Sequence, residues 1–141
     1  MKIKAYGICI YKKDNNSIKI LLCKASTSEK RWGFLKGVQE LFETKEQTAI
    51  REFKEESSII ITRNSLETYF EQQNKQKDIG IFLVDYNKVS NIALYFDRDQ
   101  LYPKYLSWEN SKVKFFCIDE LPKIKKKQKE IVSNIVKYLK R

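Results

Sequence analysis

Apolar and β-branched residues gather in short runs separated by polar turns. Residues 3–12 and 18–24 are rich in Ile, Leu and Tyr. The Asp-Asn-Asn-Ser sequence between them favours a tight turn, so the two runs predict a β-hairpin. Residues 66–72 and 112–118 also predict strands. The near-continuous apolar run 79–86 predicts a strand buried on both faces.

Two segments have helical spacing. Thr44 and Gln47 have the spacing of a capping box, which predicts a helix that starts at Thr44 and ends near Ser57 and Ser58. The tail 123–140 carries a broad apolar stripe and predicts a closing helix. The order β-β-α-β-β-β-α predicts a mixed α+β or α/β sandwich, with helices packed on a sheet.

Two other segments are less regular. Residues 32–37 are apolar but contain two glycines, which predicts a shaped segment instead of a regular strand. Residues 88–110 have no clear periodicity, and within them 101–108 are expected to form a loop with one short element.

Composition fits one domain over residues 1–141. The chain is 42% hydrophobic with only four Gly and two Pro, so it can bury a core and has little linker sequence. No apolar run suits a signal peptide or a membrane span, so we expect a cytoplasmic protein without a membrane partner. Cysteine is odd in number and lacks C-x-x-C spacing, which argues against a disulfide scaffold or a zinc site, and Cys9 and Cys23 are expected to be buried thiols.

The net charge of +10 favours anionic partners such as nucleotides, nucleic acid or acidic lipid. The lysine-rich run 123–129 fits either of two roles, contact with RNA phosphates or a solvated helix start. Composition leaves the oligomeric state open.

The chain has no histidine, which excludes Ser-His and Cys-His nucleophile pairs and leaves carboxylates as the main metal-binding groups. Glu52, Glu55 and Glu56 have i, i+3 and i+4 spacing, which gathers them on one side of the predicted helix. Arg51 can reach Glu55 and offset part of their repulsion. An ordinary solvated acidic face would have the same pattern, so the positions of nearby residues decide between the two readings.

Those positions resemble the Nudix box, usually written G-x5-E-x7-R-E-U-x-E-E-x-G-U, where U is aliphatic. The matching residues are Gly37, Glu43, Arg51, Glu52, Glu55, Glu56 and Ile59. Phe53 replaces an aliphatic residue of the box, and Ser58 replaces its second glycine. In the preceding loop, Leu35 stands in place of a frequent Pro and Phe42 in place of a frequent Gly.

The resemblance implies an α/β/α sandwich, with a mixed sheet between helices, that hydrolyses phosphoanhydride bonds with Mg²⁺ or Mn²⁺. Carried onto this chain, it makes Glu52, Glu55, Glu56 and the Gly37 carbonyl metal ligands. Glu43 and Arg51 would orient this cluster by ion pairing. The catalytic base would be Glu52 or Glu56, with Glu109 as a candidate outside the box.

The sequence TAIREFKEESSI is similar to the diadenosine tetraphosphate hydrolase branch, a relative of the bacterial RNA 5′-pyrophosphohydrolases. Dinucleoside polyphosphates are therefore the expected substrates. The alternatives are RNA 5′ ends, nucleoside triphosphates, ADP-ribose, or nucleotide binding without catalysis. Lys36 is a candidate phosphate contact. The aromatic candidates for stacking on a nucleobase are Trp32, Tyr102, Tyr105 and Trp108. Core or rim packing is the more frequent role of such residues.

Overall fold

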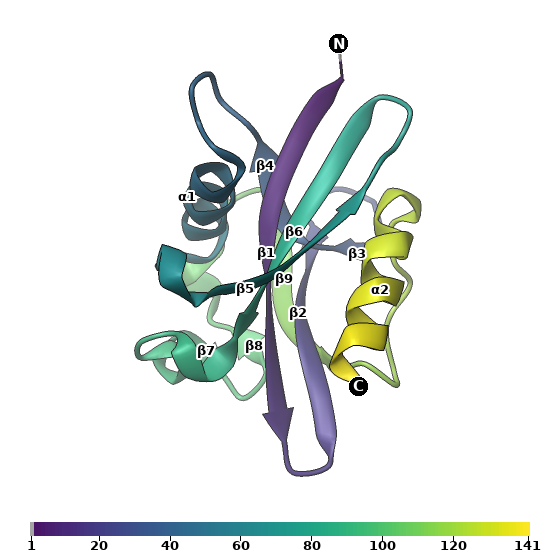
Figure 1. Cartoon of the computed structure of the whole chain (residues 1–141). Coiled ribbons are helices and arrows are strands. Elements are labelled where there is room, and N and C mark those ends of the chain that lie inside the picture. Colours follow the sequence, from purple (N-terminus) through teal and green to yellow (C-terminus); the bar gives the residue numbers. More distant parts are fainter. Residues whose placement is uncertain (1) are drawn as a thin grey trace.

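The computed structural model describes residues 2–141 and arranges them as a mixed β-sheet between two helices (Figure 1). The strands are β1 Ile3–Asp14, β2 Ser17–Ala25, β3 Trp32–Gly33, β4 Leu35–Val38, β5 Leu66–Gln72, β6 Lys77–Asp85, β7 Phe96–Asp97, β8 Gln100–Leu101 and β9 Asn110–Cys117. The helices are α1 Lys45–Ser57 and α2 Lys129–Leu139. The strand order is β5-β6-β1-β2-β9-β8-β7, with β3 attached to β2 and β4 attached to β1. The expected α/β/α sandwich is confirmed.

The first strand, β1, organises the sheet because its two halves pair with different strands. Its first half pairs antiparallel with β4, where Ala5 lies opposite Val38, and its end pairs antiparallel with β2. The strand β6 runs parallel to β1 along its other edge. Asn15, with φ of 53°, supplies the left-handed turn between β1 and β2. The predicted hairpin is confirmed, and both strands extend slightly further than predicted.

The two helices cover opposite faces of the sheet (Figure 1). Because side chains alternate along a strand, Phe82 and Val84 of β6 join the core under α1. Ile81 and Leu83 join the core under α2. This confirms that β6 is buried on both faces. Phe53 of α1 is fully buried in the first core, so the side of α1 opposite Phe53 is held towards solvent and the preceding loop.

The closing helix starts later than predicted. The helix α2 begins at Lys129, not at Lys123, and a 3₁₀ turn precedes it. The backbone of the preceding segment pairs with β3 and is therefore not available for a helix. Trp32 N–H donates to the Lys123 carbonyl, and Lys125 N–H donates to the Trp32 carbonyl. These bonds hold Lys123 to Lys125 extended beside β3. In the described part of the chain, no helix combines the length and apolarity needed to cross a bilayer.

The irregular segments contain more regular structure than predicted. Residues 32–37 contribute two short strands, β3 and most of β4, and do not form an isolated shaped loop. The segment 88–110 contains 3₁₀ turns at Ile92–Tyr95 and Pro103–Tyr105 together with β7 and β8. Two-residue strands produce no visible sequence period, which explains why the pattern did not reveal them.

The helix α1 has the capped start that its sequence predicts. The Thr44 hydroxyl accepts from Gln47 N–H at 3.1 Å, and the Gln47 side chain accepts from Thr44 N–H at 2.9 Å. The helix ends at Ser57, and the C-cap residue Ser58 adopts the left-handed conformation with φ of 67°. Ser58 occupies the position where the Nudix box has glycine. The chain therefore keeps the left-handed backbone at this position and bears the strain that a serine Cβ causes there.

We predict that Ser58→Gly stabilises the protein by about 1 kcal/mol, because glycine lacks the Cβ that penalises the left-handed region. The neighbouring Ser57 is the matched control. It is helical, its hydroxyl donates to the Phe53 carbonyl at 2.7 Å, and Ile59 N–H donates to that hydroxyl at 3.2 Å. Ser57→Gly should therefore destabilise the fold. Urea unfolding of both variants checks the opposite signs, and a loss of stability in Ser58→Gly would contradict the strain argument.

Candidate active site

The candidate site lies where the loop after β4 meets the exposed side of α1. The strand β4 carries Gly37, the loop carries Glu43, and α1 carries Arg51 with the three clustered glutamates. Residues separated by up to nineteen positions are therefore brought onto one ridge.

Arg51 is the centre of this ridge. Its guanidinium donates to Glu43 through Nε at 2.6 Å and through Nη2 at 3.0 Å. Its Nη1 donates to Glu52 at 2.7 Å and lies 3.3 Å from a Glu55 oxygen. Nη2 also reaches the Val38 carbonyl at 3.2 Å. One cation thus ties the loop to the helix and lies between the carboxylates, and its expected reach to Glu55 is confirmed.

Glu43 is held as an anion. The pKa of Glu43 is lowered to about 2, mainly by the hydrogen bonds from Arg51. Hydrogen bonds from Glu40 N–H and the Thr48 hydroxyl add smaller contributions. Its interactions use both carboxylate oxygens on protein donors. This environment suits a residue that positions Arg51 and the loop.

Glu52 lies directly against Gly37. A Cβ added to Gly37 would come within 1.9 Å of the Glu52 carboxyl carbon, so only glycine leaves room for this carboxylate. Burial is the main cause that raises the pKa of Glu52, and the charge of Glu55 adds to it. Close approach of a carboxylate to the backbone is the arrangement in which a carbonyl and a carboxylate can share one cation.

Glu56 is the most buried carboxylate of the cluster, with 6% of its surface exposed. Asn110 Nδ2 donates to its Oε1 at 2.9 Å. Burial raises the pKa of Glu56 to about 7, the Asn110 bond opposes the rise, and the charges of Glu52 and Glu109 add to it. A buried carboxylate beside other carboxylates is favoured in its charged form by a cation.

The loop before β9 completes the site. Glu109 is exposed and acts electrostatically on both Glu52 and Glu56. Its carbonyl accepts from Ser26 N–H at 2.8 Å, which fixes the loop to the end of β2. In the same loop Ser107 Oγ is buried and lacks a hydrogen-bond partner among residues 2–141. The loop therefore retains one polar group for water or ligand.

The donor set fits a hard divalent cation. Glu52, Glu55 and Glu56 supply carboxylate oxygens, and Gly37 gives a carboxylate access to the backbone. Within residues 2–141 the carboxylates do not already converge as a three-ligand group. The positions of Arg51 and Asn110 explain this, because each holds the oxygens of one or more glutamates. Glu55, with 57% of its side chain exposed, is the one most free to turn towards a cation.

A basic pocket of about 560 Å³ adjoins the site through Lys36. Its cations are Arg31, Lys36, Lys77, Lys125, Lys126 and Lys127. Glu29 is the acidic residue that lines it, and Glu29 pairs with Arg31 at 2.9 Å. Burial, then the charges of Lys77 and Lys125, lower the pKa of Lys36, and the Glu56 charge opposes this. Lys36 therefore lies between the basic pocket and the carboxylates.

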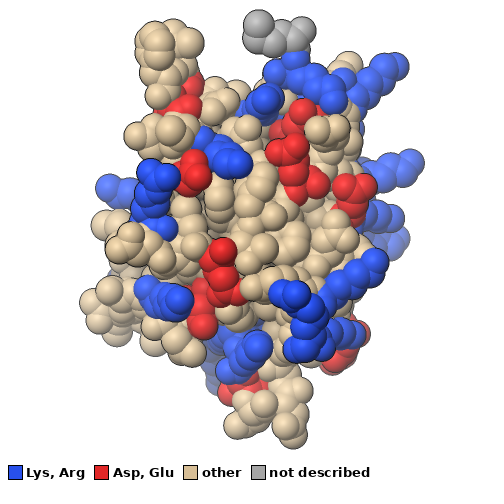
Figure 2. Space-filling model, in the orientation of Figure 1, with Lys and Arg blue, Asp and Glu red and all other residues tan. Residues whose placement is uncertain are grey.

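This concentration of positive charge is local. On the face shown in Figure 2, acidic side chains are interspersed among the lysines and arginines. The net charge of +10 alone would not locate a phosphate site. The cations that line one cavity with little acidic compensation mark a candidate phosphate site.

The aromatic candidates lie in different environments. Trp32 packs edge-on against Phe116, with ring centroids 4.7 Å apart. Tyr105 packs against Tyr95 at 4.8 Å. Trp108, beside Glu109, is 88% exposed. Packing accounts for Trp32 and Tyr105 without a substrate, whereas Trp108 has a ring available beside the site.

Sequence reasoning did not find Asn110 or Lys77 as members of the site. Asn110 contacts a glutamate 54 positions away, and Lys77 comes from a strand on the far side of β1. Neither stands in a motif, and the one available indication was that Asn110 follows Glu109.

Comparisons with known proteins identify the family of this chain. The NUDIX domain model matches residues 1–135. A Caenorhabditis elegans protein described as bis(5′-nucleosyl)-tetraphosphatase (asymmetrical) is 34% identical over 100 residues, covering 67% of this chain and 72% of that protein. A structure of a C. elegans Ap4A hydrolase binary complex superposes with a TM-score of 0.68 at 25% identity and covers 97% of each chain. The MutT protein from Methanosarcina mazei Go1, at 14% identity and a TM-score of 0.68 over 99% of this chain and 96% of its own, shares the fold. The chain therefore belongs to the Nudix hydrolase family, as its box predicts.

Proposed function

We propose that this chain, as one Nudix domain, is a Mg²⁺- or Mn²⁺-dependent pyrophosphohydrolase of dinucleoside polyphosphates such as diadenosine tetraphosphate (Ap4A). The observation that carries the proposal is the basic pocket beside the carboxylate ridge, joined to it through Lys36. The similarity to a bis(5′-nucleosyl)-tetraphosphatase supports the same substrate class.

In this proposal Glu52, Glu55, Glu56 and the Gly37 carbonyl hold the cation. A bound divalent cation would supply charge neutralisation of the phosphates and activation of water. Arg51, held by Glu43, keeps the ridge in place while the ligands turn. The two residues are positioning groups.

The reaction adds water across one phosphoanhydride. The water oxygen forms a bond to phosphorus, the anhydride P–O bond breaks, and the water proton passes to a carboxylate. Glu52, Glu56 and Glu109 are the candidate bases. Burial raises the pKa of Glu56 when no cation is bound, and a cation held beside it would lower that pKa again. Asn110 orients the Glu56 carboxylate through its 2.9 Å hydrogen bond.

The lysines would hold the part of the polyphosphate that is not attacked. Lys125, Lys126 and Lys127 precede α2, at the end of a helix where the macrodipole favours anions and disfavours cations. Glu130 in the first turn of α2 offsets part of this repulsion, and a bound polyphosphate would offset more of it. In this proposal the tetraphosphate extends from the carboxylate ridge past Lys36 into this pocket. Lys36, Trp32 and the exposed Trp108 are the proposed contacts closest to the reacting group and the nucleobase.

The exposed Lys126 and Lys127 also favour a second candidate substrate, the 5′ end of triphosphorylated RNA, whose following phosphates would lie along these lysines.

A substrate panel distinguishes the two candidates. It contains Ap4A, ATP, ADP-ribose and triphosphorylated RNA, each with Mg²⁺, Mn²⁺ or EDTA, and products are separated by ion-exchange chromatography. We expect metal-dependent conversion of Ap4A to ATP and AMP at the highest kcat/KM. Faster release of pyrophosphate from RNA would favour the second candidate, and nucleotide binding without any product would contradict catalysis.

We predict that Lys77→Gln raises KM for Ap4A about tenfold and changes kcat little, because a charge-assisted hydrogen bond to a remote phosphate contributes to binding throughout the reaction. ADP-ribose, with a shorter phosphate chain, should be affected less. Lys88→Gln is the matched control, since Lys88 is exposed in the 3₁₀ turn Tyr86–Lys88 outside the pocket. Equal KM values for Lys77→Gln and the control would remove Lys77 from the phosphate site.

A further inference from the structure

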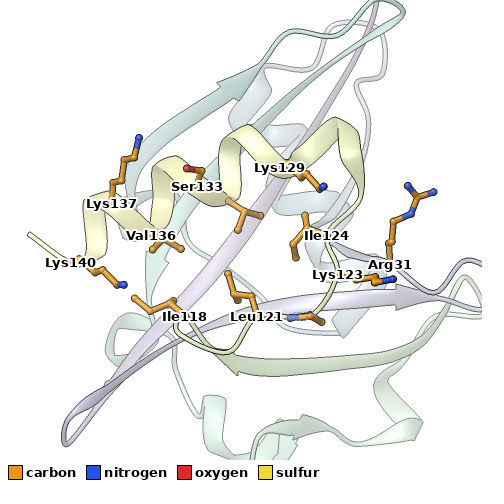
Figure 3. A pocket seen from close by; sticks show the side chains of 12 residues that line it. Arg31, Ile118, Leu121, Lys123, Ile124, Lys129, Ser133, Val136, Lys137 and Lys140 are labelled. Atoms are coloured by element: carbon orange, nitrogen blue, oxygen red, sulfur yellow. The ribbon is translucent and has the colours of Figure 1, made fainter.

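A second cavity, of about 900 Å³, lies between α2 and the segment 118–124 (Figure 3). We name it the α2 groove. Its floor is aliphatic and consists of Ile118, Leu121, Ile124, Val132 and Val136. In Figure 3 the side chains of Val136, Leu121 and Ile118 lie between the helix and the segment below it. The groove belongs to the face of the sheet covered by α2, so it is separate from the ridge on α1.

The groove has a polarity along its length. Arg31, Lys123 and Lys129 gather at one end, near the start of α2 (Figure 3). Lys140 lies at the other end and pairs with Asp119 at 2.9 Å. Lys137, in the last turn of α2, also lines the groove at that end. One end of the aliphatic channel therefore carries three cations and the other carries two, of which Lys140 is paired.

Those cations are poorly compensated. Arg31 is paired with Glu29. In residues 2–141 no carboxylate lies within ion-pairing distance of Lys123 or Lys129. Lys129 is also the first residue of α2, where the helix dipole opposes a cation. The start of α2 already holds Glu130, and the N–H groups of Glu130 and Ile131 donate to Gln72 Oε1, so an anionic group at this end would pair with Lys123 and Lys129.

The side chains that line the groove indicate which chemical group would accompany the anionic head of a ligand. No aromatic side chain from the described residues lines the groove, so it offers a nucleobase no surface for stacking. Ile, Leu and Val suit an alkyl chain, and the volume lies in the range of pockets that hold one small molecule. We propose that the α2 groove binds a free amphipathic anion, with its phosphate or carboxylate head at Lys123 and Lys129 and its alkyl chain along Val136 towards Ile118. This inference does not depend on the proposed hydrolase activity.

The test is isothermal titration of the full chain with octyl phosphate and octanoate below micelle formation. Three controls are titrated in the same way. Octanol lacks the anionic head, octylammonium carries the opposite charge, and inorganic phosphate lacks the alkyl chain. We expect saturable binding of the two anions and at least tenfold weaker binding of each control. Lys123→Gln/Lys129→Gln should weaken octyl phosphate binding about tenfold, and Val136→Thr, which keeps the volume but adds a hydroxyl, should weaken it severalfold. Lys13→Gln/Lys88→Gln is the matched control pair and should bind as the unaltered chain does.

Near-UV circular dichroism verifies that each variant is folded. No saturable binding at millimolar ligand would overturn the proposal, and so would octylammonium binding as tightly as octyl phosphate. Equal affinity in the Lys123→Gln/Lys129→Gln variant would also overturn it. A further arm uses vesicles of phosphatidylglycerol and phosphatidylcholine. Binding to vesicles without binding to free octyl phosphate would assign the groove to a membrane surface and overturn the proposed free ligand.

Discussion

Glu56→Gln is expected to lower kcat for Ap4A hydrolysis about a thousandfold, because removing a metal ligand or a general base costs on this scale. The substitution keeps the side-chain shape and an oxygen that can accept the hydrogen bond from Asn110. It removes the negative charge on which cation binding and proton transfer depend. Steady-state kinetics at saturating Mg²⁺, together with calorimetric titration of Mn²⁺, separates loss of chemistry from loss of the metal.

Glu46→Gln is the matched control, because Glu46 lies in the first turn of the same helix, away from the carboxylate ridge. It should retain activity within a factor of about two, since a single charge near a helix start contributes only ~0.3–1 kcal/mol to stability. A folded Glu56→Gln protein that retained a tenth or more of its activity would contradict the proposed role of Glu56.

The same variant should be more stable than the unaltered chain when no metal is present. Burial raises the pKa of Glu56 to about 7 in the fold, above its ordinary value. The folded state therefore holds an extra proton at mildly acid pH, and stability falls as the pH rises through 7. The difference amounts to about 3 kcal/mol at pH 8 on the scale of 1.36 kcal/mol per pKa unit. Urea unfolding in EDTA should show Glu56→Gln stabilised at pH 8 and unchanged near pH 4.5, and Mn²⁺ should stabilise only the unaltered chain.

Local signals were sufficient to predict the helix that carries the site. The capping box at Thr44 fixed where α1 starts, and the spacing of Glu52, Glu55 and Glu56 fixed which side carries the carboxylates. These features act between residues three or four positions apart, and sequence displays them directly. The family resemblance added Gly37 and Glu43 through their spacing alone.

Long-range contacts account for what the sequence did not predict. The α2 start shifted because Lys123 and Lys125 bond the backbone of Trp32, some ninety positions earlier. Asn110 reaches Glu56 because β9 pairs with β2, not because of any motif. The basic pocket draws Lys36 and Lys77 from strands on the two edges of β1. Contacts of this kind depend on topology, and no local period encodes them.

The departures from the Nudix box have a common structural consequence. Phe42 and Ser58 both stand where the family pattern favours glycine, and both adopt φ of 67°. For Phe42, which is 95% exposed, the strained backbone holds a large apolar side chain in solvent. The chain keeps the loop–helix–loop geometry of the box even where glycine is absent, so the geometry is imposed by the contacts of Arg51 and Glu43 across the loop.

Gly37→Ala is expected to lower kcat/KM for Ap4A about a hundredfold, because misplacing a catalytic group by about 1 Å costs on that scale. The added Cβ would meet the Glu52 carboxyl group at 1.9 to 2.5 Å and displace it from the backbone. Overpacking of this kind also destabilises by about 1–3 kcal/mol. Kinetics and urea unfolding in EDTA measure the two effects independently.

Gly33→Ala, in the same segment, is the matched control. Its Cβ would overlap the Gln128 side chain at 2.6 to 3.0 Å, which is a structural contact outside the carboxylate ridge. It should lower stability without changing the metal requirement.

The decisive measurement is a double-mutant cycle in stability between Gly37→Ala and Glu52→Ala. Shortening Glu52 makes room for the new Cβ, so the two effects should be non-additive, with a coupling of about 1–2 kcal/mol. Additive free energies would show that glycine is required at position 37 by the backbone of β4 and not by the position of the Glu52 carboxylate.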